Sequence, residues 1–359
     1  MSAVRPIVIA DYDPAWRDRF EYERAMLYAA CGRDAFMRIE HVGSTAVPGL
    51  AAKPIVDMMP GVRSLDAFAQ LIPSIESLGY EYVPAFERDS PAGAGMPFRR
   101  YFRKDLDGVR AFHLHCVEVG SEFWRDHLLF RNWLRFHSDD VDAYASLKRR
   151  LADEYNRTML AEDVDINVGY TDYKTELIEA IKAKARANIE RATPIVIRPH
   201  DEAWSSRYTE LHSIVAAAVG DEAAGIEHIG STSVPGLVSM PTIDIAVGVR
   251  SMETSRSTTS ALLAAGFAKG RDNFPDWRYF DLDRNPTDDN VHLHVVPFGG
   301  ERWNRYLLFR NYLRANGDMA ARYADLKRAL AAEFGKDRLG YVEAKSDFVE
   351  MVQRRAREP

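Results

Sequence analysis

The sequence predicts an α/β (or α+β) protein built from two copies of one domain. Two observations predict the duplication. The segment HVGSTAVPGLAAKPIVDMM at 41–59 returns as HIGSTSVPGLVSMPTIDIA at 228–246, and LLFRNWLR at 128–135 returns as LLFRNYLR at 307–314. A third observation, the order helix, strand, strand, helix, strands and helices within a copy, predicts the fold class. A repeat of this length is a duplicated domain, because solenoid repeats are far shorter.

The copies are predicted to span 1–188 and 193–359. The segment KARANIERAT at 184–193 is typical of a helix that ends, and PIVI at 194–197 repeats the PIVI of the N-terminal region. No Gly/Ser-rich linker separates the copies, so we expect them to pack against each other.

In copy one, Asp13 and Pro14 predict a helix start, and Gly32 predicts its end. A strand at 36–43 then stops at a glycine. The next strand, at 53–62, is mostly apolar and long enough to be buried on both faces. The remaining predicted elements are an amphipathic helix at 65–79, antiparallel strands at 99–105 and 111–119, and helices beginning at Ser121 and covering 139–156 and 172–191.

Composition limits the classes of partner. The net charge of −6 over 359 residues argues against broad binding to nucleic acid or an anionic membrane. No segment approaches the ~18 apolar residues of a membrane helix, and the two cysteines do not form a disulfide framework. We therefore expect a cytoplasmic protein that acts on a small molecule, without a nucleic-acid or membrane partner.

The Gly-Ser-Thr turn after the first strand is the first candidate site. A glycine permits a sharp turn, and the N–H groups and hydroxyls that follow can face an anion, which predicts phosphate contacts for Gly43, Ser44 and Thr45. The alternative is that the segment is only a turn. Asp57 follows inside an apolar strand, where an unpaired charge costs several kcal/mol. It is a metal-binding or catalytic carboxylate, or a buried aspartate that accepts backbone bonds.

These segments resemble the signature of the GrpB family, and the similarity continues through HLH, FRNWLR, YASLK and YTDYK over nearly all of both halves. GrpB proteins resemble the nucleotidyltransferase superfamily, which implies a mixed β-sheet flanked by helices, a phosphate-binding Gly-Ser turn, Mg²⁺, and ATP or another nucleoside triphosphate. The resemblance places Ser44 and Ser231 at the phosphate, and Asp57 and Asp244 at the first metal-binding carboxylate.

The sequence departs from that superfamily pattern at the second acid. Residues i and i+2 of a strand share a face, and the positions two residues beyond the aspartates hold Met59 and Ala246. A pair of Mg²⁺ ions needs several carboxylates. Either other ligands complete the site, with Glu40 as one candidate, or the site binds a nucleotide without this chemistry.

The HLH segments place His113 and His115 on one face of a strand, as they do His292 and His294. This spacing suits a shared ligand, a metal, or a general base. The alternative is one core histidine and one exposed histidine in each copy. We assign His115 as the candidate base, and Asp57 with His113 as candidate metal ligands.

Several basic residues are candidates for contacts with phosphate groups. Arg131, Lys148 and Lys174 lie on three predicted helices and would cradle a triphosphate if they converge above the sheet. Lys53 and Arg103 would neutralise charge that develops during transfer. Copy two has Met240 and Asp281 at these two positions, so copy one keeps the anion-binding set. The second-copy equivalents of the site are Gly230, Ser231, Thr232, Asp244, His292, His294 and Arg310.

The leading hypothesis is an enzyme that binds a nucleoside triphosphate with Mg²⁺ in copy one. It would transfer a nucleotidyl group to a small acceptor or adenylate it, as ATP-dependent ligases do. One alternative is a non-catalytic binding module for a nucleotide or a CoA-like ligand, which the resemblance suggests because GrpB domains also occur fused to a CoA-biosynthetic kinase. Another is a metal-dependent enzyme of a different class that uses His113, His115 and Asp57. The loop at 87–100 is a candidate substrate lid or a tolerated insertion.

Overall fold

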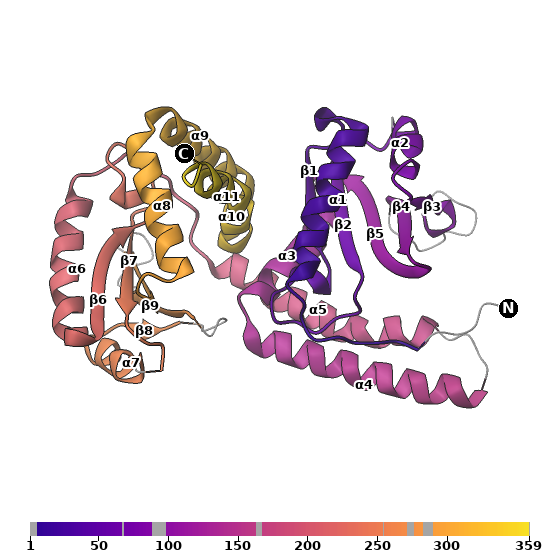
Figure 1. Cartoon of the computed structure of the whole chain (residues 1–359), viewed down its shortest axis with the longest axis horizontal. Coiled ribbons are helices and arrows are strands. Elements are labelled where there is room, and N and C mark those ends of the chain that lie inside the picture. The colour runs from indigo at the N-terminus through magenta and orange to yellow at the C-terminus, as the bar shows by residue number, and fades with distance from the viewer. Residues whose placement is uncertain are drawn as a thin grey trace. The chain divides into compact units, whose positions relative to one another are not determined.

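The computed structural model describes residues 6–66, 68–87, 98–162, 167–253, 255–270, 276–282 and 290–358, without the side chains of 159–162, 167–173, 255 and 256. The chain divides into two compact units, Met1–Arg186 and Ala187–Pro359. Each unit contains one mixed five-stranded sheet with helices around it (Figure 1). The predicted fold class and the duplication are therefore confirmed. The candidate lid falls largely on 88–97, outside the described residues.

Unit one follows the predicted order of elements, with additional short turns of 3-10 helix, of which the one at Ser44–Ala46 belongs to the Gly-Ser-Thr segment of the site. Its elements are α1 (Ala15–Cys31), β1 (Arg38–Val42), η2 (Ser44–Ala46), β2 (Val56–Val62), η3 (Phe68–Leu71), α2 (Ile72–Glu76), β3 (Glu81–Tyr82), β4 (Arg100–Leu106), β5 (Val109–Glu118), α3 (Glu122–Arg135), α4 (Ser138–Glu162) and α5 (Asn167–Arg191).

Unit two repeats this order. Its elements are α6 (Ala203–Val219), β6 (Ala223–Ile229), η6 (Ser231–Ser233), β7 (Thr242–Val249), α7 (Ser255–Ala264), β8 (Ala268–Lys269), β9 (Arg278–Leu282), β10 (Asn290–Pro297), α8 (Glu301–Ala315), α9 (Gly317–Phe334), α10 (Arg338–Ala344) and α11 (Ser346–Arg355).

The two sheets have the same topology, with strand orders β1-β2-β5-β4-β3 and β6-β7-β10-β9-β8. The pairs β2–β5 and β7–β10 are parallel, and the other neighbours are antiparallel. This register sets Asp57 beside His113 and Asp244 beside His292. Residues far apart in the sequence thus meet in the middle of each sheet.

Strand alternation gives each face of the first sheet its own core. Met58 packs in the core that α1 covers, together with Trp16 and Leu114, whereas Met59 packs against Trp124 of α3 on the other face. Asp57, one residue before Met58, therefore faces the same side as α3. Burial of such large apolar side chains contributes roughly 1.5–3 kcal/mol each and holds the carboxylate at a fixed depth.

The predicted single helix at 65–79 is wrong in its extent. The described chain forms the 3-10 turn η3 and then the short helix α2. Pro73, in the first turn of α2, has no N–H to donate, and its ring clashes with the carbonyl four residues earlier in a continuous helix. Gly79 follows with φ 86° and permits the turn into β3.

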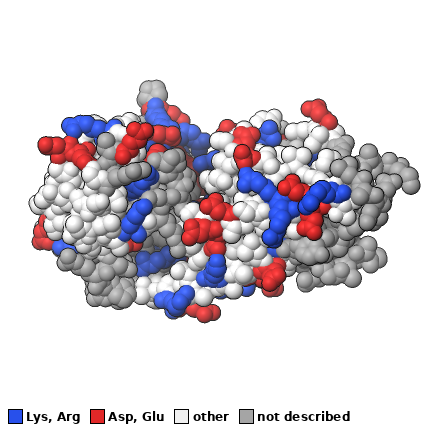
Figure 2. Space-filling view, turned by 90° about the horizontal axis from the view of Figure 1, so that it is seen from below, with Lys and Arg blue, Asp and Glu red and all other residues white. Residues whose placement is uncertain are grey.

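No helix among the described residues is long and apolar enough to span a membrane. On the face shown in Figure 2, basic and acidic side chains lie interspersed among neutral ones. Such a mixture on the visible described surface does not favour a polyanionic partner on that face.

Candidate functional site

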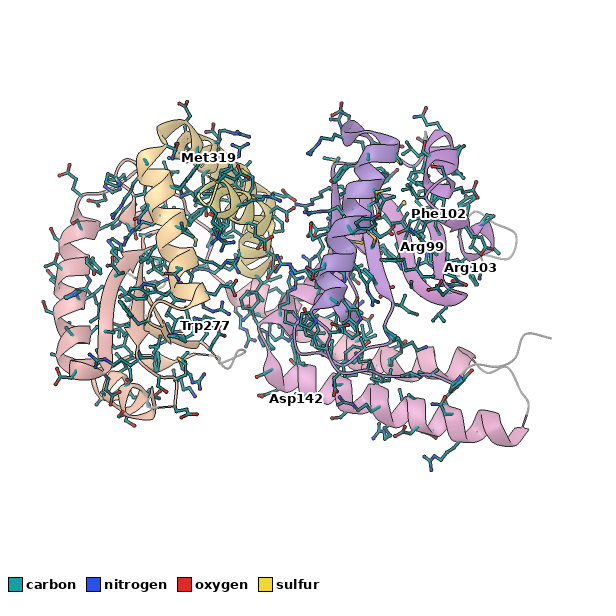
Figure 3. The ribbon with its side chains drawn as sticks, viewed as in Figure 1. Arg99, Phe102, Arg103, Asp142, Trp277 and Met319 are labelled. Carbon is teal, nitrogen blue, oxygen red and sulfur yellow. The ribbon has the colours of Figure 1, made fainter. Side chains whose placement is uncertain are left out.

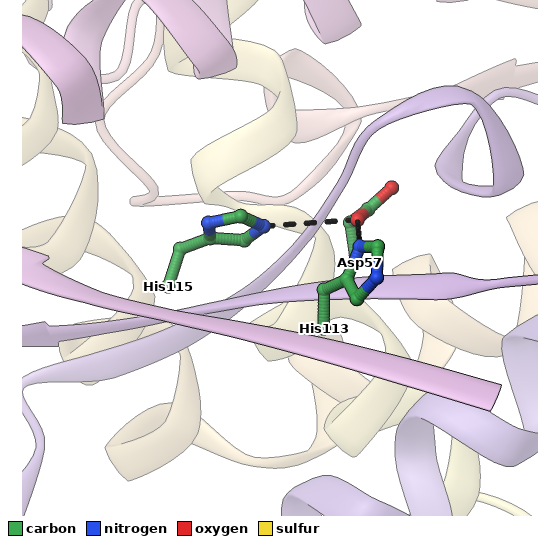
Figure 4. A group of neighbouring side chains, drawn as sticks. All are labelled: Asp57, His113 and His115. Atoms are coloured by element: carbon green, nitrogen blue, oxygen red, sulfur yellow. Dashed lines mark hydrogen bonds and ion pairs between the residues drawn. The ribbon is translucent and has the colours of Figure 1, made fainter. Parts of the chain in front are cut away.

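Asp57 lies near the start of β2 at the centre of a group of three polar side chains (Figure 4). Its Oδ1 atom is 3.1 Å from Nδ1 of His113 and 3.7 Å from Nε2 of His115. The side chains of Asp57 and His113 are 28% and 26% exposed, so the pair borders solvent. Both histidines belong to β5, where alternation directs them to one face.

Copy two contains the same group at the same distances. Oδ1 of Asp244 is 3.1 Å from Nδ1 of His292 and 3.7 Å from Nε2 of His294. The pairing of one carboxylate with both histidines was not predicted in this form. It follows from the parallel register of the two central strands in each sheet.

The glycine of the Gly-Ser-Thr turn makes room for the carboxylate. Gly43 has φ 70°, and a Cβ at this position would lie 2.3 Å from Oδ2 of Asp57. Gly230 is the same, with φ 69° and 2.2 Å to Oδ2 of Asp244. In both copies the turn backbone therefore covers the second carboxylate oxygen closely.

We expect Gly43→Ala to lower the free energy of unfolding by about 3 kcal/mol, because a positive φ and a steric clash add. The control is Gly49→Ala, since Gly49 also has positive φ (80°) but nothing lies within 4 Å of its Cβ position. That change should cost only about 1 kcal/mol from backbone strain. Urea denaturation measures both, and equal losses would contradict the close contact with Asp57.

The other two residues of the turn, Ser44 and Thr45, are half-buried and buried, and the Thr45 hydroxyl makes its hydrogen bonds within the protein. Thr45 is 2% exposed, its Oγ1 donates to the Ile55 carbonyl (3.2 Å), and Nε2 of His41 lies 3.0 Å away. Burial lowers the pKa of His41 to about 3, with nearby arginines adding to the effect, so His41 is neutral and donates to Thr45. In copy two, Thr232 repeats these contacts, and its hydroxyl donates to the Thr242 carbonyl (3.0 Å).

Three lysines of copy one interact electrostatically with Asp57. Lys53, before β2, Lys148 of α4 and Lys174 of α5 each interact electrostatically with its carboxylate, and Lys174 interacts with the other two. Burial, with a smaller effect from the neighbouring lysines, lowers the pKa of Lys148 to about 7 and that of Lys174 to about 8. Nζ of Lys148 donates to the Ala51 carbonyl and lies 4.5 Å from the Tyr144 ring centre.

Copy two keeps two of these lysines. Burial lowers the pKa of Lys327 to about 7 and that of Lys345 to about 8, and both interact with Asp244. Met240 replaces the third lysine. In each copy the lysines that the sequence singled out interact electrostatically with the aspartate, and copy one has one such lysine more than copy two.

The predicted arginines are placed differently. Arg131 is 5% exposed and donates to Oε2 of Glu40 (2.6 Å), to the His41 carbonyl and to Asn132. Arg310 of copy two makes the same set of contacts with Glu227, the His228 carbonyl and Asn311. These arginines join the helix to the edge strand. Glu40, the candidate for the missing second carboxylate, is thus already bound to Arg131.

Arg103 lies beside His113 in the strand register, but its guanidinium binds Glu81 through two bonds of 2.6 and 2.8 Å. Copy two has Asp281 at this position, beside His292. Whether Arg103 contacts a ligand stays a prediction.

One contact of the site was missed at the sequence level. Nη1 of Arg99 donates to Nδ1 of His115 (2.7 Å), and in copy two Nε1 of Trp277 donates to Nδ1 of His294 (3.2 Å). Both donors, labelled in Figure 3, come from the segment that leads into the neighbouring strand. The two residues are chemically unlike, so comparing the halves of the sequence gives no signal for them.

These donors fix the proton on the second histidine. Guanidinium and indole groups only donate hydrogen bonds, so Nδ1 of His115 must accept, and its proton is on Nε2, facing Asp57. Burial lowers the pKa of His115 to about 4, so the ring is neutral at pH 7. Burial by itself raises the pKa of Asp57, but the bonds from both histidines outweigh this, and the pKa falls below its usual range. The ionised carboxylate only accepts, so Nδ1 of His113 donates to it and Nε2 of His113 can accept a proton.

The sequence profile of the "GrpB protein" family matches residues 6–184 and 194–355, which cover most of both units. The chain belongs to the GrpB family. A UPF0157 protein of Streptomyces coelicolor is 39% identical over 165 residues, 46% of this chain and 86% of the relative. The glutamate-rich protein GrpB of Alkalihalophilus pseudofirmus is 30% identical over 166 residues, 44% of this chain and 93% of the relative.

Further similarities are to one curated protein and to two solved structures. A Mycolicibacterium paratuberculosis protein named dephospho-CoA kinase is 29% identical over 160 residues, 40% of this chain and 39% of its own length. The crystal structure of GrpB from Enterococcus faecalis has 32% identity and a TM-score of 0.41, over 50% of this chain and 96% of that one. The Megavirus polyadenylate synthase, at 7% identity and a TM-score of 0.23 over 96% of this chain and 66% of that one, is too distant to assign a reaction.

The residues of this GrpB chain do not fit Mg²⁺. Among the described residues, the potential ligand group is Asp57, His113 and His115, with ligand atoms within 4.8 Å of one another. Mg²⁺ requires oxygen ligands in an octahedral arrangement, and this set offers one carboxylate and two imidazoles. Met59, which follows Asp57 by two residues on the same face of β2, is an apolar side chain that is fully buried and offers no oxygen ligand. A transition metal would accept imidazole nitrogens, but Arg99 holds the proton on the His115 nitrogen that would have to ligate it.

Proposed function

We propose that the Asp57 centre binds the phosphate groups of a nucleotide or CoA-like ligand without a resident Mg²⁺. The observation that carries the proposal is the group of three lysines around one carboxylate. Phosphate oxygens accept hydrogen bonds from ammonium groups as point charges, and a partly buried site strengthens the attraction. The match to a segment of a protein named dephospho-CoA kinase supports a phosphate-bearing ligand.

The proposal extends to nucleotidyl transfer, with His113 as general base. Asp57 orients the ring through Nδ1, and Nε2 accepts the proton of an acceptor hydroxyl as its oxygen attacks phosphorus and pyrophosphate leaves. We assign this role to His113 because both ring nitrogens of His115 already contact protein groups, Arg99 and Asp57. For a carboxylate acceptor, no proton transfer is needed, and the product is an acyl adenylate.

Ligand binding should take up protons at pH 8. A bound polyanion favours the charged forms of Lys148 and Lys174, so their pKa values rise on binding, and the site gains up to about one proton. Since the protonated lysines bind the anion, affinity should fall as pH rises from 7 to 9. Calorimetric titration of ATP in HEPES and in Tris, both with EDTA, measures the proton uptake from the difference in apparent enthalpy.

Two outcomes would contradict this proposal. Binding that disappears in EDTA and returns with Mn²⁺ or Zn²⁺ would favour a metal centre at Asp57, His113 and His115. Binding that does not change between pH 7 and pH 9 would remove the lysines from the ligand site. Tight binding without pyrophosphate release, tested with pooled small acceptors, would favour the non-catalytic binding module.

A further inference from the structure

We infer that copy two carries a separate ligand site, which binds a small organic anion on Arg302 and Arg305 beside Asp244. A pocket of about 370 Å³ opens next to Asp244 and His294, and α8 supplies both arginines to its wall. This volume lies within the range of small-molecule sites. The inference is independent of the function proposed for copy one.

The two guanidiniums are held in place by neighbouring groups. Arg302 lies over the Trp277 ring (5.5 Å to its centre) and hydrogen-bonds Tyr306, whereas Nε of Arg305 donates to Oε1 of Gln353 (2.9 Å). Their ion pairs are long. Arg302 lies 3.6 Å from Asp276, and Arg305 lies 4.0 Å from Glu301, one turn earlier in α8. Oriented guanidiniums with long ion pairs are suited to bind an incoming carboxylate or phosphate through paired bonds.

The two copies carry an arginine and an aromatic residue at opposite positions, and in copy two this places the Arg302 charge at the pocket. Relative to the shared FRN segment, Arg302 corresponds to Phe123. In the strand register, where Tyr101 pairs with His115 and Tyr279 with His294, Trp277 corresponds to Arg99. In copy one, Arg99 lies over Phe123 (5.6 Å) and its guanidinium binds His115. In copy two, the neutral indole makes the bond to the histidine, and the guanidinium lines the pocket instead.

The next position of the wall also differs in charge. Arg305 corresponds to Asp126, which pairs with Lys182 and Arg186 at 2.7 Å in copy one. The carboxylate–histidine group has the same distances in both copies, whereas the two compared helix positions hold Phe123 and Asp126 in copy one and Arg302 and Arg305 in copy two, where Asp276 and Glu301 also line the pocket. This contrast gives the two centres different ligand specificities.

The remaining lining limits the class of ligand. Ile229, Phe309 and Val349 contribute apolar surface. The carboxylates of Asp244, Asp276 and Glu301 also line the pocket, so it disfavours a polyanion. It therefore fits an organic ligand whose one anionic group, a carboxylate or a phosphate monoester, contacts the two guanidiniums, with an apolar or aromatic body. Contacts of the anion with two guanidiniums would be charge-assisted, so removal of either should weaken binding about tenfold or more.

Calorimetric titration of the full-length protein with benzoate and with phenyl phosphate tests the inference, and the better ligand identifies the anion. We expect one site per chain, binding weakened at least tenfold by Arg302→Gln and by Arg305→Gln, and no binding of neutral benzyl alcohol. Arg305→Lys should have an intermediate effect, because it keeps the charge and loses the fork. The matched control is Arg328→Gln, since Arg328 is exposed on α9 and pairs with Asp325.

Circular dichroism and a melting curve establish that each variant is folded. Unchanged affinity in both folded arginine variants would overturn the inference, as would the absence of saturable binding of either probe to the wild type. Loss of binding in Lys148→Met, with the arginine variants unaffected, would also overturn it, because the anion would then bind in copy one.

Discussion

Asp57→Asn should separate turnover from binding. We expect pyrophosphate release to fall about 10²- to 10⁴-fold, because an amide no longer orients His113 or stabilises its protonated ring. ATP should bind as tightly as before or up to about tenfold more tightly, because the substitution removes a negative charge from among three lysines. Calorimetry in EDTA and a pyrophosphate assay measure the two effects.

The control for this variant is Asp244→Asn, which makes the same change in copy two and should leave ATP affinity and pyrophosphate release at the wild-type level. A metal centre predicts the opposite pattern for Asp57→Asn, because loss of the only carboxylate of the group removes the ion and the ligand together. Weakened ATP binding in this variant would therefore reject the metal-independent proposal.

Lys148→Met should weaken ATP binding about 10- to 100-fold. Hydrogen bonds to a charged group are worth about 1.5–3 kcal/mol, and the buried position of Lys148 reduces screening by salt. Methionine retains an unbranched apolar stem of similar length, so packing over Tyr144 should be largely preserved. The dissociation constant at pH 7 in EDTA is the quantity to measure.

Lys327→Met is the matched control, because Lys327 occupies the same position in copy two, lies over Tyr323 (4.6 Å) and donates to the Val238 carbonyl. It should leave ATP affinity unchanged. If both variants weaken ATP binding equally, the ligand is bound by both copies, and the assignment of the nucleotide site to copy one would be wrong.

Much of the fold could be predicted from the sequence, because its strongest signals are local. The duplicated segments predicted two domains, and the apolar run at 53–62 predicted a strand buried on both faces, which is β2. The turn at Asp107 and Gly108 reported the antiparallel pair β4–β5, and both residues have positive φ. The helix at 65–79 is shorter than its apolar spacing predicts, because Pro73 cannot continue an α-helix from the residues before it, so α2 begins at Ile72.

The site was predicted in its residues but not in its contacts. Asp57, His113 and the lysines were singled out, but their spacing did not show that one carboxylate oxygen faces both histidines. Arg131 was read as a ligand-binding charge, whereas the structure has it buried against Glu40. The residue type alone does not show whether an arginine is buried or exposed, because its burial depends on the packing of the tertiary structure.

The sequence by itself determined the family, the duplication, and the aspartate, histidines and lysines of each centre, because these are properties of residue type and order. Only the tertiary structure decided how those residues act. The parallel strands place each aspartate beside two histidines, and Arg99 and Trp277 set the proton position on the second one. A hydrogen bond depends on the direction of its donor in space, and that direction is set by the packing of strands and helices distant in the chain.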